Sequence, residues 1–198
     1  MTVPPESGRG TVIRLRAEVD ALDQAMSSAV LRTPTPVLDP VIRHLSRASD
    51  YKALWFATSA AVAMFDGRRG RRAAVRCLAA IGATSVLVDL VGKLAFPRER
   101  PDADPVAADR IARRPTSSSF PSGHAATASA FATAFRQEYP LLGLPVSALA
   151  AVVSYGRVHT GVHYPSDVIV GALVGSGAAS LTGPLVERAG RPGQRGTR

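Results

Sequence analysis

The stretch SSSFPSGHAATASAF, residues 117–131, places a proline, a serine, a glycine and a histidine at the head of an alanine-rich apolar run. Pro121 and Ser122 are typical of a helix start, with the serine as the N-cap. The backbone N–H groups near Ser122 and Gly123 can also bind an anion at the positive end of such a helix. An ordinary cap and an anion site therefore both fit this stretch taken alone.

Outward from this stretch, the chain divides into arginine-rich ends and a middle made of Ala, Val, Leu and Gly runs. Its 198 residues suit one domain. The single cysteine, Cys77, excludes a disulfide framework and a thiolate zinc site. The net charge of +9 fits nucleic acid, anionic lipid headgroups or a phosphorylated substrate, and it also fits arginines that fix membrane topology.

Five apolar segments follow one another along the chain, and we predict that each forms a helix. Several are shorter than the ~20 residues that cross a typical bilayer, but each can lengthen at its ends. We therefore predict an all-α integral membrane bundle of about five spanning helices, with a soluble helical bundle as the alternative. The segments are 53–65, 73–92, 124–135, 141–155 and 168–186.

The residues before these segments have a different pattern. Apolar residues recur at helical spacing over 11–31, with charged residues between them, which predicts an amphipathic helix on the membrane surface. A helix of a soluble bundle is the alternative. We predict three parts: a tail with this amphipathic helix over 1–50, a membrane domain over 51–187, and a basic disordered tail over 188–198.

The charged loops predict a topology. The loop 66–72 and the C-terminus from Glu187 are rich in arginine, and both satisfy the positive-inside rule if they are cytoplasmic. Counting the crossings then places 93–121 and 156–164 together on the outer side. The first of these outer loops is itself basic, which breaks the rule unless its charges have another function. We predict a multi-pass cell-membrane protein with an extracytoplasmic site.

Three clusters on that outer side carry groups that bind phosphate. Together they supply guanidinium groups, a lysine, two histidines, a carboxylate and a helix N-terminus. Guanidinium groups match phosphate oxygens bidentately, and lysine adds a point charge. The clusters are KLAFPRERP at 93–101, PSGH at 121–124 and GRVHTGVHYPSD at 156–167.

The three clusters resemble the three-part signature of the type 2 phosphatidic acid phosphatases (PAP2), also called lipid phosphate phosphatases. The resemblance covers about 93–167, and one departure is Gly156, where the family usually has serine. The matching residues are Lys93-x6-Arg100-Pro101, then Pro121-Ser122-Gly123-His124, then Arg157-x5-His163-x3-Asp167.

The resemblance implies hydrolysis of the phosphate monoester or diphosphate of a membrane lipid, without a metal or cofactor, through a phosphohistidine. His163 would be the nucleophile, Asp167 would orient its other ring nitrogen, and His124 would be the general acid. The equatorial phosphate oxygens would be held by Lys93, Arg100, Ser122, Gly123 and Arg157. The lipid could be of the phosphatidic acid, phosphatidylglycerol phosphate, polyprenyl diphosphate or phosphorylated polyprenyl-sugar type.

Other interpretations of single residues stay open. His159, His163 and Asp167 have the spacing of a zinc site on a continuous helix, but Gly161 and Pro165 interrupt that helix. Lysine and arginine at helix ends can simply extend to the membrane interface. A carboxylate such as Asp89 is costly within an apolar helix and predicts a polar partner.

Other functions also remain as alternatives. The chain could be a basic, membrane-associated protein that binds anions without catalysis. A vanadium haloperoxidase would use the same anion site, but such enzymes are soluble and larger. Nucleic acid is not an expected partner, because few aromatic residues lie among the basic ones and no nucleic-acid motif is present. The expected partners are a lipid phosphate and the bilayer, and the sequence does not assign an oligomeric state.

Overall fold

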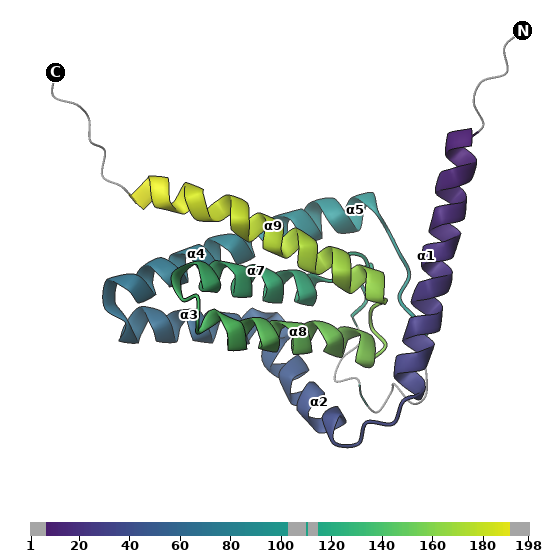
Figure 1. The fold of residues 1–198 in the computed structure, drawn as a ribbon, viewed down its shortest axis with the longest axis horizontal. Helices are drawn as coiled ribbons and strands as arrows, with labels where there is room; N and C mark the ends of the chain where they lie inside the picture. Colours follow the sequence, from purple (N-terminus) through teal and green to yellow (C-terminus); the bar gives the residue numbers. More distant parts are fainter. Residues whose placement is uncertain (1–6, 103–109, 111–114, 191–198) are drawn as a thin grey trace, which may run out of the picture.

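The computed structural model describes residues 7–102, 110 and 115–190, and within these residues the regular structure is entirely helical. In chain order the helices are α1 (Ser7–Arg32), α2 (Leu38–Ser49), a 3-10 turn η1 (Asp50–Lys52), α3 (Ala53–Phe65), α4 (Gly67–Ser85), a π-helical segment η2 (Val86–Gly92), α5 (Lys93–Ala95), α7 (Gly123–Glu138), α8 (Gly143–His159) and α9 (Pro165–Gly190). Helices α3, α4, α7, α8 and α9 run along one another as a bundle, and α1 crosses one end of it (Figure 1). The predicted all-α fold is confirmed.

Helix α7 forms the centre of the bundle, with α4, α8 and α9 packed around it. Its buried face consists mainly of alanines, so neighbouring helices approach closely. A row of aromatic rings fills the remaining space. The ring centroid of Phe131 lies 4.9 Å from that of Trp55 and 5.7 Å from that of Phe135. These rings give the core its large buried apolar groups.

Glycines on α9 bring this helix close to α7. A Cβ at Gly171 would lie 2.5 Å from the carbonyl oxygen of Ser122, and a Cβ at Gly175 would lie 2.0 Å from that of Ala126. Small residues spaced by four along a helix allow such close backbone contact, as in membrane helix pairs. The N-terminal ends of α7 and α9 are therefore held side by side at one end of the bundle.

The charged loops separate to the two ends of the bundle, as predicted. At one end, Arg72 and Arg76 pair with Glu138, and Arg76 also pairs with Glu187 near the end of α9. The three sequence clusters with phosphate-binding groups meet at the opposite end, around the starts of α7 and α9. The grouping of the loops at two ends is therefore confirmed, whereas their orientation across a membrane stays a prediction.

Among the described residues, two helices are long and apolar enough to cross a membrane. They are Gly67–Ala95, which joins α4, η2 and α5, and Pro165–Ala189 in α9. Helix α3 is apolar but shorter. The predicted number of about five crossings therefore stays a prediction.

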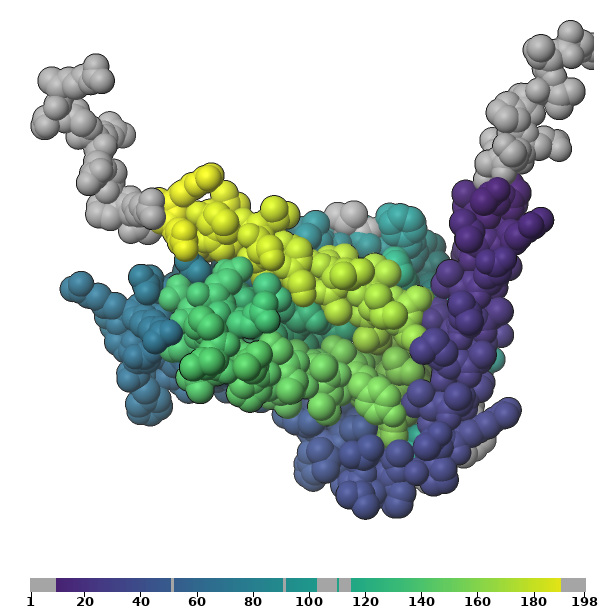
Figure 2. Space-filling view, in the orientation of Figure 1, coloured from purple at the N-terminus to yellow at the C-terminus, as the bar shows by residue number. Residues whose placement is uncertain are grey.

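The predicted amphipathic helix is present as α1. Its first part projects beyond the bundle (Figure 2), and several of its apolar residues are exposed, including Val12, Ile13 and Leu22. Helix α1 begins at Ser7, and α9 continues three residues past the predicted boundary at 187, so residues 188–190 are helical. Residues 191–198 lie outside the described residues, and the division at 50/51 stays a prediction.

Helix α2 explains the departure from the family pattern at position 156. A Cβ at Gly156 would lie 3.0 Å from Cγ2 of Ile42, which is tighter than ordinary contact. Ile42 is buried on the apolar side of α2. Glycine at 156 therefore lets α2 pack directly on α8 beside the end of the bundle that carries the clusters.

Candidate active site

The start of α7 is organised by Ser122. Its side chain is fully buried, and its Oγ caps the helix by accepting from the amide of Ala125 at 3.5 Å. Its own amide donates to the carbonyl oxygen of Asp167 at 3.0 Å. The hydroxyl of Ser122 thus serves as the helix cap, and its predicted contact with phosphate stays a prediction.

The next two amides are suited to an anion. Gly123 and His124 are the first residues of α7, so their N–H groups have no intrahelical acceptor. A Cβ at Gly123 would meet only Cγ1 of Val88, at 3.8 Å. Because packing does not require glycine here, the missing side chain leaves room for a ligand to approach the backbone.

His163 lies in the turn between α8 and α9, with both of its ring nitrogens directed at charged groups. Its Nε2 lies 3.2 Å from Nη1 of Arg100, and its Nδ1 lies 3.6 Å from Oδ2 of Asp167. A guanidinium only donates, so Nε2 must accept and the proton must be on Nδ1. The lone pair at Nε2 is the one that a nucleophilic imidazole needs, and Asp167 faces the protonated nitrogen.

The protonation state of His163 also suits a nucleophile. Burial lowers the pKa of His163 to about 4, with the positive charges of Arg157 and Arg100 acting in the same direction and Asp167 opposing them. The imidazole is therefore neutral at neutral pH. A neutral ring keeps its lone pair available for attack.

Arg100 is held in place by the loop before α7. Its Nε donates to the carbonyl oxygen of Ser117 at 2.9 Å, and its Nη1 donates to that of Val162 at 2.7 Å. In the same loop, the amide of Ser119 donates to the carbonyl oxygen of Arg98 at 2.9 Å. The serines before α7 thus position Arg98 and Arg100 near His163.

Arg98 is a site residue that the sequence analysis missed. Its Nη1 donates to Oδ1 of the fully buried Asp167 at 2.8 Å, while the amide of Tyr164 donates to Oδ2 of the same carboxylate at 2.9 Å. The other end of the Arg98 guanidinium contacts Asp23 and Asp20 of α1, at 2.8 Å and 2.7 Å. Helix α1 is therefore connected to the carboxylate behind His163.

Asp23 reinforces this connection. Its carboxylate also accepts from the amide of Ser166 at 2.9 Å and from the hydroxyl of the same residue. Asp23 is buried, although it belongs to a helix that is otherwise mostly exposed. In the sequence, Asp23 is an acidic residue on the polar face of an amphipathic helix. Nothing in that pattern distinguishes it from a charge exposed to solvent.

His124 and Arg157 complete the group of predicted catalytic residues. Nε2 of His124 lies 3.4 Å from Oδ1 of Asp50, a residue that the sequence analysis did not select. Arg157, His163 and Arg100 all act electrostatically on the His124 imidazole. Arg157 is buried, and its Nε has no hydrogen-bond partner within the described part of the chain. A buried guanidinium with an unused donor fits an anionic ligand.

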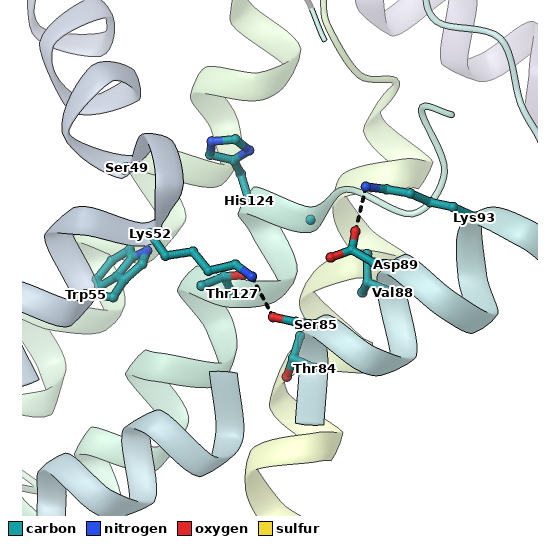
Figure 3. Close-up of a pocket in the computed structure, with 11 residues that line it drawn as sticks. Ser49, Lys52, Trp55, Thr84, Ser85, Val88, Asp89, Lys93, His124 and Thr127 are labelled. Carbon is teal, nitrogen blue, oxygen red and sulfur yellow. Dashed lines mark hydrogen bonds and ion pairs between the residues drawn. The ribbon is translucent and has the colours of Figure 1, made fainter. Parts of the chain in front are cut away.

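Lys93 and His124 both line a pocket of about 180 Å³ (Figure 3). Its Nζ pairs with Oδ1 of Asp89 at 2.6 Å, one helical turn away. This pair supplies the polar partner that Asp89 was predicted to have. The pocket is lined by Ser49, Lys52, Trp55, Thr84, Ser85, Val88, Asp89, Lys93, Gly123, His124 and Thr127.

His159 has a separate structural contact. Its Nε2 lies 2.7 Å from Oδ1 of Asp39 in α2, and the same carboxylate pairs with Arg110 at 3.4 Å. His159 therefore joins α8 to α2. Within the described residues, no group of three or more His, Cys, Asp or Glu side chains is placed to hold a metal ion.

The fold and the candidate site together define an all-helical protein that gathers two histidines, a buried carboxylate and several cations at one end of its bundle. Residues 73–191 match the family model of the PAP2 superfamily. The chain belongs to the PAP2 superfamily, and the resemblance of the three clusters is confirmed.

Relatives of known function support this assignment. The chain is 31% identical over 181 residues to the decaprenylphosphoryl-5-phosphoribose phosphatase of Mycobacterium tuberculosis (strain CDC 1551 / Oshkosh), covering 91% of this chain and 94% of that protein. It is 42% identical over 72 residues to the lipid A 1-phosphatase of Rhizobium johnstonii, covering 36% of this chain. The chain spans 30% of the length of that second relative, and about a third of several curated relatives that it matches.

A solved structure shares the fold. The transmembrane PAP2-type phosphatidylglycerolphosphate phosphatase of Bacillus subtilis superposes with a TM-score of 0.65 and 26% identity, over 88% of this chain and 89% of that one. This likeness and the two long apolar helices indicate a membrane protein.

Proposed function

We propose that the chain hydrolyses the terminal phosphate of a membrane lipid through a phosphohistidine at His163, without a metal ion. The observation that carries this proposal is the arrangement around His163. Its Nε2 lone pair faces Arg100 and its Nδ1 faces the buried Asp167. The unused donor of Arg157 lies nearby, together with His124 at the head of α7. Cations, a neutral nucleophile and an acid thus converge on one small region.

The geometry suggests the order of bond changes. A phosphate that enters the site takes over the Nη1 donor of Arg100 and frees Nε2 of His163. A P–N bond then forms at Nε2 while the P–O bond to the leaving group breaks, and His124, which takes up a proton when the anionic phosphate binds, gives that proton to the leaving oxygen. Asp167 stabilises the positive charge that develops on the imidazole. In the second half, water attacks the phosphorus, the P–N bond breaks to restore neutral His163, and His124 accepts the proton of that water.

An apolar groove lies on the side of the bundle, close to the candidate nucleophile. It has a volume of about 530 Å³ and lies between α1, α7, α8 and α9, with Val168 and Ile169 of α9 among its apolar walls. Its lining includes Pro165, two residues from His163. Apolar lipid chains can thus lie against the bundle near the site. Positive-inside topology places the arginine end of the bundle in the cytoplasm and the site on the outer side of a multi-pass protein.

The relatives favour one class of lipid among the predicted ones. The decaprenylphosphoryl-5-phosphoribose phosphatase, which this chain covers over 94% of its length, is named for a polyprenyl lipid that carries a phosphorylated ribose. We therefore favour a phosphorylated polyprenyl sugar over phosphatidic acid, phosphatidylglycerol phosphate or polyprenyl diphosphate.

Phosphate release from detergent-solubilised protein, with EDTA present and with a panel of lipid phosphates and diphosphates, tests the proposal. We expect release by the wild type and none above background by His163→Gln. His44→Gln, an exposed histidine of α2, serves as the matched control and is expected to retain activity. Near-normal activity of His163→Gln would exclude the phosphohistidine, and failure of the folded wild type on every lipid would exclude the function.

A further inference from the structure

Beside His124 lies a small polar pocket, most of whose walls the proposed phosphohistidine chemistry does not use. We propose that this pocket binds the leaving part of the substrate, namely a sugar that carries a phosphodiester, and that Lys52 recognises the phosphodiester. The proposal rests on the phosphatase function proposed above. It assigns the polar link between the scissile phosphate and the lipid tail to a defined set of side chains.

The position of the pocket follows from in-line phosphoryl transfer. The attacking and leaving atoms lie on opposite sides of the phosphorus, roughly in line. The pocket walls include His124, Gly123 and Lys93 of the phosphate site, but His163 is not among them. A leaving group protonated by His124 therefore points into this pocket, away from the nucleophile. Its volume of about 180 Å³ is below the roughly 300–1,000 Å³ of pockets for drug-sized ligands, which suits a headgroup fragment.

Lys52 is held towards the pocket by an unusual backbone conformation. Among the described non-glycine residues, it alone has a positive φ, of 62°. Such a conformation costs about 1–3 kcal/mol and persists only where the surroundings enforce it. Its Nζ reaches across from η1 to Oγ of Ser85 at 2.6 Å (Figure 3). This partner is neutral, so the ammonium charge remains available for an anionic group of the ligand.

The other walls offer hydrogen bonds to hydroxyl groups. Oγ of Ser49 and Oγ1 of Thr84 are buried and have no hydrogen-bond partner in the described part of the chain. Buried polar atoms are nearly always hydrogen-bonded in folded proteins, so two such atoms around one pocket indicate a polar ligand. Asp89 adds an acceptor and Trp55 adds an aromatic wall. This combination suits a sugar ring better than a fatty acyl chain.

A comparison of two substrates tests the proposal. One is a polyprenyl phosphoryl pentose 5-phosphate, and the other is the polyprenyl monophosphate with the same tail but without the sugar and the phosphodiester. We expect the wild type to prefer the first, and Lys52→Met to lower the ratio of the two kcat/KM values by about 10- to 100-fold, as the loss of a charge-assisted hydrogen bond would. Ser49→Ala should lower the same ratio by a smaller factor.

Arg68→Met is the matched control, because Arg68 is an exposed cation at the opposite end of the bundle. It should leave the ratio unchanged. Equal losses on both substrates in Lys52→Met and Ser49→Ala, or a wild type that prefers the lipid without the sugar, would overturn the pocket assignment while leaving the phosphatase function intact. A wild type that cleaves neither substrate nor any other lipid phosphate would instead overturn the proposed function.

Discussion

Close contact between α7 and α9 makes Gly175→Ala a sharp test of the packing. A Cβ at position 175 would lie 2.0 Å from the carbonyl oxygen of Ala126, where ordinary contact begins at 3.4 Å. The obstacle is backbone, so the two helices must move apart. An extra methyl group in a packed core costs about 1–3 kcal/mol, and the better helix propensity of alanine recovers about 1 kcal/mol. We expect a net loss of up to about 2 kcal/mol.

The chain contains its own reporter for this loss. Cys77 is the single cysteine, is fully buried, and lies against α7 with Sγ 3.9 Å from the carbonyl oxygen of Phe131. Heating the solubilised protein with a thiol-reactive fluorogenic dye therefore measures the opening of the bundle. One kcal/mol shifts the midpoint of a domain of this size by about 2–4 °C, so Gly175→Ala should unfold up to about 8 °C lower.

Gly177→Ala is the matched control on the same helix. Nothing lies within 4 Å of the position that a Cβ would take there, so this variant should unfold at the wild-type temperature or slightly above it. If Gly175→Ala and Gly177→Ala shift the midpoint equally, close contact between α7 and α9 is not what holds these helices together.

Two further predictions concern the site. Asp23→Asn should lower kcat by at least about tenfold, because small displacements of catalytic groups are costly. Asp20→Asn should have little effect, since the Asp20 side chain is 45% exposed and that of Asp23 is 4% exposed. Equal effects of the two variants in phosphate-release assays would contradict a positioning role for Asp23. Burial lowers the pKa of His163 to about 4, with Arg157 and Arg100 acting in the same direction and Asp167 opposing them. The usual pKa is ~6.5, so the folded state loses stability as the pH falls from about 6.5 towards 4. The unfolding midpoint of the wild type should therefore fall relative to that of His163→Gln between pH 7.5 and 5.5, and a constant difference would argue against a buried neutral imidazole.

Part of the predicted site has short-range spacing, whereas Lys93, Arg100 and His124 were predicted from the family resemblance. Arg157, His163 and Asp167 lie within eleven residues of one another, so a helix end, a turn and a helix start suffice to bring them together. Continuous apolar segments likewise predicted the bundle helices, because a helix that is apolar all round must be buried or face lipid. The two ends of the bundle followed from the alternation of apolar segments and charged loops.

The contacts that the sequence did not predict join distant segments through ordinary polar residues. Asp23 and Arg98 are 75 residues apart, and neither has a neighbour pattern that distinguishes it from a solvated charge. The roles of Asp50 and Lys52 depend on the path of η1, where Lys52 adopts a backbone conformation that propensity disfavours. Ser122 was assigned to phosphate by resemblance, whereas its position at the helix start uses the hydroxyl as a cap.

The charges around His124 show how the residues that the sequence did not predict contribute to the site. The basic loop 93–121 breaks the positive-inside rule, and the structure shows where two of its charges are used: Arg98 pairs with Asp20, Asp23 and Asp167, and Lys93 pairs with Asp89. Such pairs are internal contacts of the site, so these cations carry no information on topology. Arg157 and Lys52 face His124 from other elements, and their positive charge is what an anionic substrate would neutralise. The first 52 residues therefore contribute to the candidate site, since α1 supports the carboxylate behind His163 and η1 places charged groups beside His124.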